Sequence, residues 1–322
     1  MCTSVFLEGE KPLFGRNMDV YFDLERSVII TPRDYGFSLR FEEDLCRHHA
    51  IIGMGMVREG YPLYFDAMNE KGMAIAGLDF PENAFYSPSC ETGKINVTPF
   101  ELIPYLLSRC EDVDEALSII DKMNIVAENF SEDMPLSPLH WHIADRTRSA
   151  VLESTRAGIR VYENKIGVMT NSPTFDFHLL ELARYSNLSP ENPMSGAFLE
   201  DIKPFSFGFG AIGLPGDLSS TSRFVRAAYL LKNSVEGDDP VSQFFHILDG
   251  VAMVRGAVDT GKGNRYDITT YSSCADLENG IYYYKTYENS RVSAAVLSST
   301  PLSGADILSY PVKKTNDIEF IK

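Results

Sequence analysis

The chain opens with Met1-Cys2-Thr3-Ser4-Val5-Phe6-Leu7, the stretch from which both the fold and the chemistry can be argued. Residues 3–7 and 13–17 alternate like two short strands, and the segment from Glu8 to Pro12 between them is typical of a turn. The pattern predicts a β-hairpin, so the N-terminus begins inside a sheet.

Cys2 becomes the N-terminal residue if the initiator Met1 is removed. A thiol with a pKa of about 8.5 would then share one residue with an α-amine of pKa about 7.7–8.0. Such a residue is a nucleophile that carries its own base. A cysteine is also often a small buried apolar side chain, and Cys2 alone leaves that alternative open.

The run Phe14-Gly15-Arg16-Asn17-Met18-Asp19 supplies two charges that a reactive cysteine needs. A fixed cation such as Arg16 lowers the pKa of a neighbouring thiol and favours the thiolate. A carboxylate such as Asp19 can hold and orient an amine. A turn with a surface ion pair would give the same letters.

The composition excludes several classes of protein. The chain has 322 residues, 44% of them apolar, a formal net charge of −16 and a sequence pI near 4.8. Such a negative field repels phosphate backbones and anionic membranes, so we expect no nucleic-acid partner and no docking on such membranes. No apolar stretch is long enough to span a bilayer, so we expect no membrane insertion. The first residues show no basic region followed by an apolar run, so we expect a cytoplasmic protein.

Five cysteines stand far apart, with no Cys-x-x-Cys pair: Cys2, Cys46, Cys90, Cys110 and Cys274. An odd number at wide spacing argues against a disulfide framework and against a zinc ribbon. We therefore expect reduced thiols, of which one can be special, and no metal site.

The predicted elements come in blocks of one kind. Strands are expected at 3–7, 13–17, 27–31, 49–57, 63–67, 73–78, 138–145, 149–154, 158–162, 166–170, 266–273, 280–286 and 292–297. Helical spacing occupies 99–108, 113–123, 177–185, 222–231 and 241–254. Strands and helices in separate runs indicate an α+β fold rather than a doubly wound sheet.

Two familiar patterns carry little weight. Gly208-Phe-Gly210-Ala-Ile-Gly213 has the letters of a dinucleotide fingerprint, but Leu214-Pro215-Gly216 follows where a helix should start. We interpret it as a turn or the rim of a site, without NAD. His140 and His142 face the same side of a predicted strand, and packing is a better explanation for them than metal binding.

Two further polar positions have both a plain and a functional interpretation. Asn171, at the end of a predicted strand, is typical of a turn, but its amide could also stabilise an oxyanion. Arg223 lies in the first turn of a predicted helix, the unfavourable end for a cation. That placement suggests a buried anionic partner.

Taken together, these stretches resemble the choloylglycine hydrolase family, which includes bile salt hydrolases and penicillin V acylases. The resemblance extends over nearly the whole chain. Its anchors are residues 1–3, 14–19, 64–72 (Tyr-Phe-Asp-Ala-Met-Asn-Glu-Lys-Gly), 170–176 (Thr-Asn-Ser-Pro-Thr-Phe-Asp), 214–217 (Leu-Pro-Gly-Asp) and 222–224 (Ser-Arg-Phe).

The resemblance implies an N-terminal nucleophile hydrolase, a four-layer αββα sandwich of two antiparallel sheets between helix layers. It implies one domain over residues 1–322, with Met1 removed, no cofactor and a homotetramer. It further implies catalytic roles: Cys2 as nucleophile with its α-amine as base, Arg16 and Asp19 as the residues that tune them, Asn171 as oxyanion donor, and Arg223 as the family's active-site arginine.

Asp79 departs from the family pattern, in which bile salt hydrolases usually have Asn and penicillin V acylases often Tyr. The second oxyanion donor expected there is a backbone N–H, which Asp79 retains, so the change puts substrate preference in question. We expect the carboxylate to turn away and pair with a cation or a backbone N–H. An apolar groove for the acyl group could be lined by loop residues Tyr21, Phe22, Tyr61, Phe130, Met134 and Leu136.

The expected reaction is hydrolysis of glycine- or taurine-conjugated bile acids through a Cys2 thioester. A penicillin V acylase or another N-acyl amidase would use the same chemistry on a different apolar acid. A protein that only binds bile acids or acyl amides is the remaining alternative, and an inert thiol in the mature chain would support it.

Overall fold

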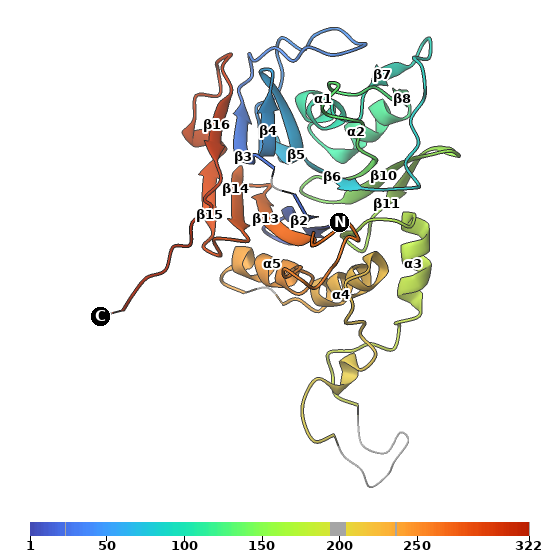
Figure 1. Ribbon diagram of the computed structural model, residues 1–322, viewed down its shortest axis with the longest axis vertical. Coiled ribbons are helices and arrows are strands. Elements are labelled where there is room, and N and C mark those ends of the chain that lie inside the picture. The colour runs from blue at the N-terminus through green and yellow to red at the C-terminus, as the bar shows by residue number, and fades with distance from the viewer. Residues whose placement is uncertain (23, 194–203, 236, 322) are drawn as a thin grey trace.

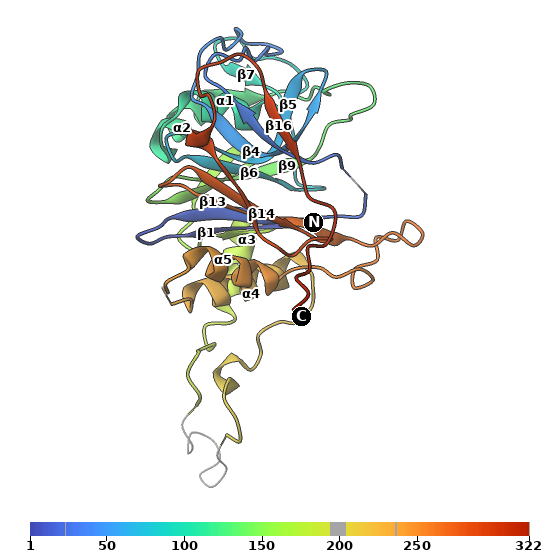
Figure 2. The same ribbon diagram turned by 90° about the vertical axis from the view of Figure 1, so that its left-hand side faces the viewer.

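The computed structural model describes residues 1–22, 24–193, 204–235 and 237–321. Two antiparallel sheets pack face to face, and helices cover their outer faces (Figures 1 and 2). This is the four-layer αββα sandwich of an α+β protein, as predicted.

The first sheet carries the N-terminus near its centre. Its strands, in spatial order, are β12 (Val168–Met169), β1 (Cys2–Leu7), β2 (Leu13–Val20), β13 (Ile268–Asp276), β14 (Ile281–Thr286) and β15 (Ser293–Val296). The predicted hairpin is confirmed, because β1 pairs with β2 in a register that places Cys2 opposite Met18 and Leu7 opposite Leu13.

The second sheet is larger. Its order is β11 (Gly158–Glu163), β10 (Ser149–Thr155), β9 (Leu139–Ala144), β6 (Ala74–Asp79), β5 (Tyr61–Asn69), β4 (Ile51–Arg58), β3 (Ser27–Thr31) and β16 (Leu308–Pro311). A separate parallel pair joins β7 (Ile95–Val97) to β8 (Met123–Ile125).

Helices form the two outer layers. On the second sheet lie α1 (Leu102–Arg109) and α2 (Val113–Ile120); α4 (Ser220–Lys232) and α5 (Pro240–Asp249) lie on the first sheet, with α3 (Phe175–Ala183) beside α4 (Figure 1). The 3-10 turns are η1 (Phe209–Ala211) and η2 (Leu297–Ser299). Among the described residues, no helix has the length and apolar character that crossing a bilayer requires.

Burial on both faces explains why several strands are continuous apolar or small-residue runs. All nine residues of β13 and the first six of β4 are buried. A strand with both faces covered gains little from polar residues at alternate positions. The periodicity of such a run is weak, so its extent has to be judged from the turn residues at each end.

Three elements differ from expectation. Met123 was expected to end a helix, but α2 ends at Ile120 and Met123 opens β8. Lys122 N–H closes a tight turn on the Ile119 carbonyl, while the Lys122 carbonyl accepts from Ile95 N–H, so pairing with β7 takes over there. The short strands β7 and β16 were not anticipated. The Gly208–Gly213 segment forms the turn η1, as interpreted.

His142 joins the two sheets and gives the fold a titratable element. Its Nδ1 lies 2.7 Å from Ser4 Oγ on β1, and its Nε2 accepts from Asn164 Nδ2 at 3.0 Å. Burial lowers the pKa of His142 to about 3, with a smaller contribution from the charge of His140. The imidazole is therefore neutral in the folded protein.

We expect His142 to make the protein sensitive to acid. The pKa of His142 in the folded protein is below the unfolded value of about 6.5. The contribution of His142 to the free energy of unfolding is therefore complete above about pH 6.5 and is lost as the pH falls toward 3. Between about pH 6 and 4, His142→Gln should flatten the pH dependence of the free energy of unfolding by about 1.4 kcal/mol per pH unit. Urea unfolding across this range measures the slope. The exposed His246→Gln is the control, and equal slopes in all three proteins would contradict the assignment.

Candidate active site

Cys2 is the first residue of β1 and lies in the gap between the two sheets, where it is only 3% exposed. Its Sγ contacts the Arg16 guanidinium, which reaches it from the neighbouring strand β2. The hairpin register produces this contact, because Ser4 pairs with Arg16 and so brings the long arginine side chain alongside the start of β1. The sequence prediction of a cation beside this thiol therefore agrees with the geometry.

Arg16 is held rigidly at 1% exposure. Its Nη1 donates to the carbonyls of Gly77 at 2.5 Å and Phe65 at 3.3 Å, both in the opposite sheet. Burial by itself would lower the pKa of Arg16, but the charges of nearby groups, Cys2 foremost, outweigh it and raise the pKa above its ordinary value. The guanidinium is thus a permanent cation within reach of the thiol.

Asp66 on β5 was not assigned a role from the sequence, although it lies in the 64–72 anchor. It is buried and accepts hydrogen bonds from Tyr271 at 2.5 Å, from Ser273 at 2.9 Å and from Tyr282. Burial raises the pKa of Asp66, and the charge of Arg16 opposes that shift. Asp66 therefore lies close enough to Arg16 for its charge to interact with the guanidinium. The sequence signal that could have identified Asp66 is a charged residue inside an otherwise apolar strand.

Asp19 lies at the end of β2 with no exposed surface. Its Oδ1 accepts from Thr269 Oγ1 at 2.6 Å, whereas Oδ2 has no hydrogen bond from a described residue and lies 3.9 Å from Arg223 Nη1. Burial raises the pKa of Asp19, and the charges of Arg223 and of the N-terminal amine oppose that shift. One oxygen of Asp19 is thus available on the side of the N-terminus.

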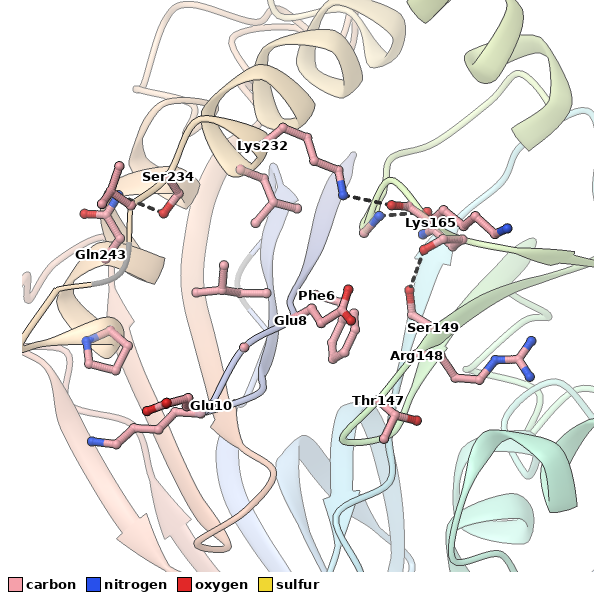
Figure 3. Close-up of a pocket in the computed structure, with 18 of the residues that line it drawn as sticks. Phe6, Glu8, Glu10, Thr147, Arg148, Ser149, Lys165, Lys232, Ser234 and Gln243 are labelled. Carbon is pink, nitrogen blue, oxygen red and sulfur yellow. Dashed lines mark hydrogen bonds between the residues drawn. The ribbon is translucent and has the colours of Figure 1, made fainter.

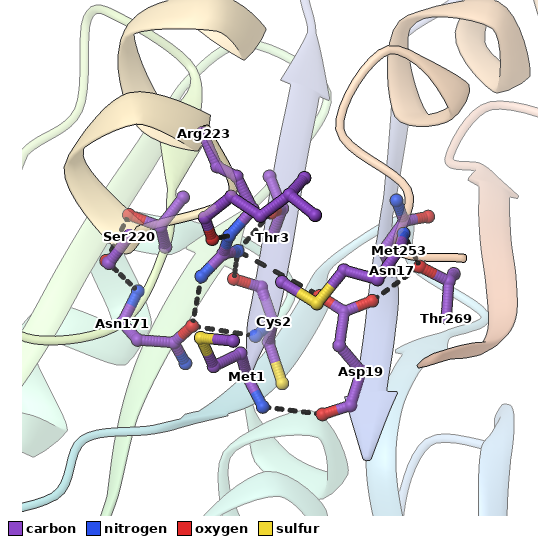
Figure 4. Close-up of polar contacts among 12 residues, drawn as sticks. Met1, Cys2, Thr3, Asn17, Asp19, Asn171, Ser220, Arg223, Met253 and Thr269 are labelled. Atoms are coloured by element: carbon purple, nitrogen blue, oxygen red, sulfur yellow. Dashed lines mark hydrogen bonds and ion pairs between the residues drawn. The ribbon is translucent and has the colours of Figure 1, made fainter. Parts of the chain in front are cut away.

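Asn171 and Arg223 complete the group around Cys2 (Figure 4). The backbone N–H of Cys2 donates to Asn171 Oδ1 at 2.7 Å, and Arg223 Nη2 donates to the same oxygen at 2.8 Å. Arg223 Nη1 also donates to the Cys2 carbonyl at 2.5 Å and to Thr3 Oγ1 at 2.6 Å. The buried anion suggested for this arginine by its place in the helix is Asp19.

Two histidines fix the backbone of Asn171 from behind, and their role was not foreseen. His140 Nε2 lies 2.8 Å from the Thr170 carbonyl, and His178 Nε2 lies 2.9 Å from the Asn171 carbonyl. A carbonyl can only accept, so both Nε2 atoms carry the hydrogen. Glu153, fully buried, lies 3.5 Å from His140 Nδ1. Both imidazoles hold the peptide that presents the Asn171 side chain.

Asp79 presents its backbone, rather than its side chain, to Asn171. Asn171 Nδ2 donates to the Asp79 carbonyl at 2.7 Å. Leu139 on β9 lies opposite Asp79. The Leu139 N–H donates to Tyr86 Oη, and the Leu139 carbonyl accepts from the same hydroxyl. Asp79 and Leu139 therefore exchange no backbone hydrogen bonds. In a strand the N–H and C=O of one residue point the same way, so the Asp79 N–H also faces the side of Asn171.

The Asp79 carboxylate does not show the pairing expected for it. It is half-buried and has no hydrogen bond from the described residues. The nearby cations are already engaged: the Met1 amine donates to the Asp19 carbonyl, and Arg16 donates to two carbonyls. Burial raises the pKa of Asp79, and the charges of the N-terminal amine and His140 oppose the shift.

Met1 covers the residues around Cys2. It extends β1 by one residue, because its amine donates to the Asp19 carbonyl at 2.5 Å and its carbonyl accepts from Asp19 N–H at 2.8 Å. The Met1 side chain lies beside Cys2 and Asn171 in Figure 4. With Met1 attached, the Cys2 nitrogen is an amide without basic character.

The residues expected to line an acyl groove fall into two groups. Tyr21 and Phe22 directly follow β2 and contact each other edge to face, with Phe22 47% exposed. The second group packs over the outer face of the second sheet, where the rings of Tyr61 and Phe130 are 5.9 Å apart. Met134 and Leu136 pack partly buried against the same cluster. Within the described part of the chain, no hydrogen bond joins either group to Cys2.

Two hollows in the surface lie away from this centre. The larger, about 810 Å³, lies at the opposite end of β1 and is lined by Phe6, Glu8 and Glu10 among others (Figure 3). The other, about 620 Å³, lies between α2, β8 and the β10–β11 hairpin. Cys2 lines neither. Among the described residues, no group of three His, Cys, Asp or Glu side chains is arranged to hold a metal ion.

Comparison with known proteins agrees with the geometry. Residues 2–310 match the model of the family "linear amide C-N hydrolases, choloylglycine hydrolase family". The chain is 46% identical over 319 residues to the bile salt hydrolase/transferase of Lactiplantibacillus plantarum, covering 97% of each. A mutant conjugated bile acid hydrolase from Clostridium perfringens superposes with a TM-score of 0.94 at 38% identity, covering both chains completely. The penicillin V acylase of Agrobacterium tumefaciens shares the fold, with a TM-score of 0.76 at 20% identity over 96% of this chain and 90% of its own.

An αββα sandwich that holds a cysteine at the second position beside a buried arginine defines an amide hydrolase of the N-terminal nucleophile type. Within that class, the chain belongs to the choloylglycine hydrolase family.

Proposed function

We propose that the protein hydrolyses the amide bond of glycine- or taurine-conjugated bile acids through a thioester on Cys2. The observation that carries the proposal is the contact between Cys2 Sγ and the buried Arg16 guanidinium. A cation fixed in contact with a cysteine sulfur favours the thiolate, which is the attacking form of cysteine. The names of the two bile acid relatives support the substrate class.

In the proposed mechanism, Met1 is first removed and the Cys2 nitrogen becomes a free α-amine. The α-amine takes the proton of the Cys2 thiol, and the thiolate attacks the amide carbonyl. The α-ammonium then passes that proton to the departing glycine or taurine nitrogen. Water then hydrolyses the thioester. Asp19 Oδ2, which has no hydrogen bond from a described residue, can accept from the new ammonium, and Arg223 holds Asn171 and the Cys2 carbonyl in place.

Two donors would stabilise the tetrahedral oxyanion in this scheme. One is the second amide hydrogen of Asn171, since only one Nδ2 hydrogen is used on the Asp79 carbonyl. The other is the Asp79 backbone N–H. One such donor contributes about 3–4 kcal/mol to the transition state. The Asp79 carboxylate would then influence which amide is preferred.

We expect Asn171→Ala to lower kcat about 100-fold or more while KM changes far less, because an oxyanion donor acts mainly on the transition state. Steady-state kinetics on glycocholate measure both values. Ser172→Ala is the matched control, because its hydroxyl bonds the Pro81 carbonyl on the neighbouring loop and should leave kcat nearly unchanged. A change in KM alone would mean that Asn171 only holds the substrate.

The acyl group would lie against the apolar loop residues. Tyr21 and Phe22 are the better placed, because they directly follow the end of β2 at Val20, next to Asp19, and Phe22 is exposed. Tyr61, Phe130, Met134 and Leu136 would form a second wall. A phenoxyacetyl group or a fatty acyl chain is also an apolar acid, so a penicillin V acylase or another N-acyl amidase is the alternative activity.

An assay of amine release separates these activities. Purified protein is incubated in parallel with glycocholate, taurocholate and penicillin V, and the free amine is quantified. The proposal predicts rapid release of glycine or taurine and slow release from penicillin V. Faster turnover of penicillin V would replace the proposal with its alternative, and no release from any of the three would favour a binding protein.

We also propose that the 322 residues form one domain, that the protein is a homotetramer, and that it acts in the cytoplasm. Free thiols at all five cysteines fit a reducing compartment. The described residues 204–219, which precede α4 and extend away from the sandwich (Figure 1), carry apolar side chains that support self-association. Phe205 and Phe207 are 92% and 95% exposed. Sedimentation of the Phe205→Ser/Phe207→Ser variant against the wild type tests the assembly.

A further inference from the structure

Asp267, which directly precedes β13, carries a carboxylate that the proposed mechanism does not use. The residue is 8% exposed, and its only hydrogen bond from a described group comes from the Met1 amine, 3.5 Å from Oδ2. The same contact is an ion pair between the ammonium and the carboxylate. Asp267 thus binds a primary ammonium group beside Cys2.

Maturation removes this partner. Once Met1 is cleaved, the buried carboxylate of Asp267 keeps no hydrogen bond to a described residue. Taking a carboxylate out of water without a partner is costly, so the position favours another cation. Arg223 lies near enough to sense the charge of Asp267 without forming an ion pair with it in the described structure.

The position of the Met1 amine relates this site to the reaction. Met1 N precedes Cys2 N by one residue, a step of about 3.3–3.6 Å in an extended chain. A departing amine must come within hydrogen-bond reach of the Cys2 α-amine to receive its proton, so its nitrogen has to lie at about the place of Met1 N. Asp79 offers a second carboxylate, whose charge interacts with both the N-terminal amine and Asp267.

We propose that Asp267 is the binding residue for the amine partner of the reaction. It holds the ammonium group of a released amine, and it holds primary ammonium compounds that enter and capture the acyl group from the Cys2 thioester. Transfer as such is part of the name of the Lactiplantibacillus plantarum relative, and the inference is that Asp267 binds the amine. The inference rests on the proposed function, because it needs that thioester. It assigns a ligand class, primary ammonium compounds, to a carboxylate that otherwise has no role.

The capture step balances without an oxidant or a reductant. The bound ammonium releases one proton to solvent, and its nitrogen lone pair forms a C–N bond with the thioester carbonyl. The C–S bond then breaks, and its electron pair returns to Cys2 Sγ as thiolate. The second N–H proton passes to the Cys2 α-amine, leaving an amide product and the free enzyme.

A comparison of two acceptors tests the role of Asp267. Mature enzyme is given glycocholate with either ethanolamine, an ammonium ion at neutral pH, or hydroxylamine, which is largely uncharged there. The ratio of transfer product to free cholate is measured against acceptor concentration. Asp267→Asn should lower this ratio about tenfold with low concentrations of ethanolamine, because a charge-assisted hydrogen bond is lost, and leave it unchanged with hydroxylamine. The exposed Asp306→Asn is the charge-matched control and should behave as wild type.

The wild type alone gives a second test if Asp267→Asn does not fold. Transfer to ethanolamine should saturate with concentration, whereas transfer to hydroxylamine should stay proportional to concentration. Equal effects of Asp267→Asn on the two acceptors, or proportional transfer with both, would overturn the role of Asp267. Absence of cholate release and of transfer to either acceptor would instead refute the proposed function.

Discussion

Replacing Cys2 with serine is expected to lower kcat on glycocholate by about a thousandfold or more, with the fold intact. An alkoxide is far harder to form than a thiolate, and the fixed cation at Arg16 cannot make up a difference of this size. Losing the nucleophile of a covalent mechanism removes most of the rate enhancement. The measurement is glycine release by purified variant, with circular dichroism to verify folding.

The other four cysteines provide the controls. Cys46 and Cys90 are exposed, and their replacement by serine should retain activity. Cys110 and Cys274 are buried, and burial raises the pKa of Cys110 to about 12 and that of Cys274 well above its ordinary value. Both are inert packing thiols, best replaced by alanine. A folded but inactive Cys274→Ala variant would show that the reactive thiol has been misassigned.

Retention of Met1 is expected to reduce activity at least about 100-fold, the contribution of a general base. With Met1 in place, the Cys2 nitrogen is an amide that donates to Asn171 Oδ1, and it has no lone pair available as a base. The thiol is also covered, since Cys2 is 3% exposed in this form.

Two chains that differ only in Met1 measure this effect. Cleavage of a fusion protein directly before residue 1 or directly before residue 2 provides them, and intact-mass spectrometry verifies each N-terminus. The kinetics of both on glycocholate are then compared. Equal activity of the two chains would show that the base is not the α-amine of Cys2.

Much of the fold could be predicted because local patterns and turn residues agree with the final structure. The hairpin formed by β1 and β2, the strand β3 and the helix α4 were expected within three residues of their observed ends, and α2 and α5 begin where expected but end earlier. Asp112, the N-cap of α2, accepts from Glu115 N–H at 2.9 Å. The strands β7, β8 and β16 were missed or misassigned because three or four residues are too few to show a period, and they exist through their pairing partners.

The site was predictable only where its residues lie near Cys2 in sequence or within a recognisable anchor. Arg16 and Asp19 belong to the strand that pairs with β1, so a hairpin brings them to Cys2. Asp66 and Asp267 reach the centre through long-range sheet packing, which leaves no periodic signal in the chain. His178 acts on the Asn171 backbone from a helix, where a histidine on an apolar face looks like any core residue.

The most direct test of a covalent Cys2 intermediate is intact-mass spectrometry of enzyme quenched in acid within milliseconds of mixing with glycocholate. The account predicts a chain without Met1 whose mass is increased by that of cholic acid less one water, with the adduct on the peptide that begins at Cys2. The adduct should be absent from Cys2→Ser and from wild-type enzyme that is quenched only after the glycocholate has been consumed. An adduct on another residue, or full turnover by a chain that retains Met1, would contradict the account.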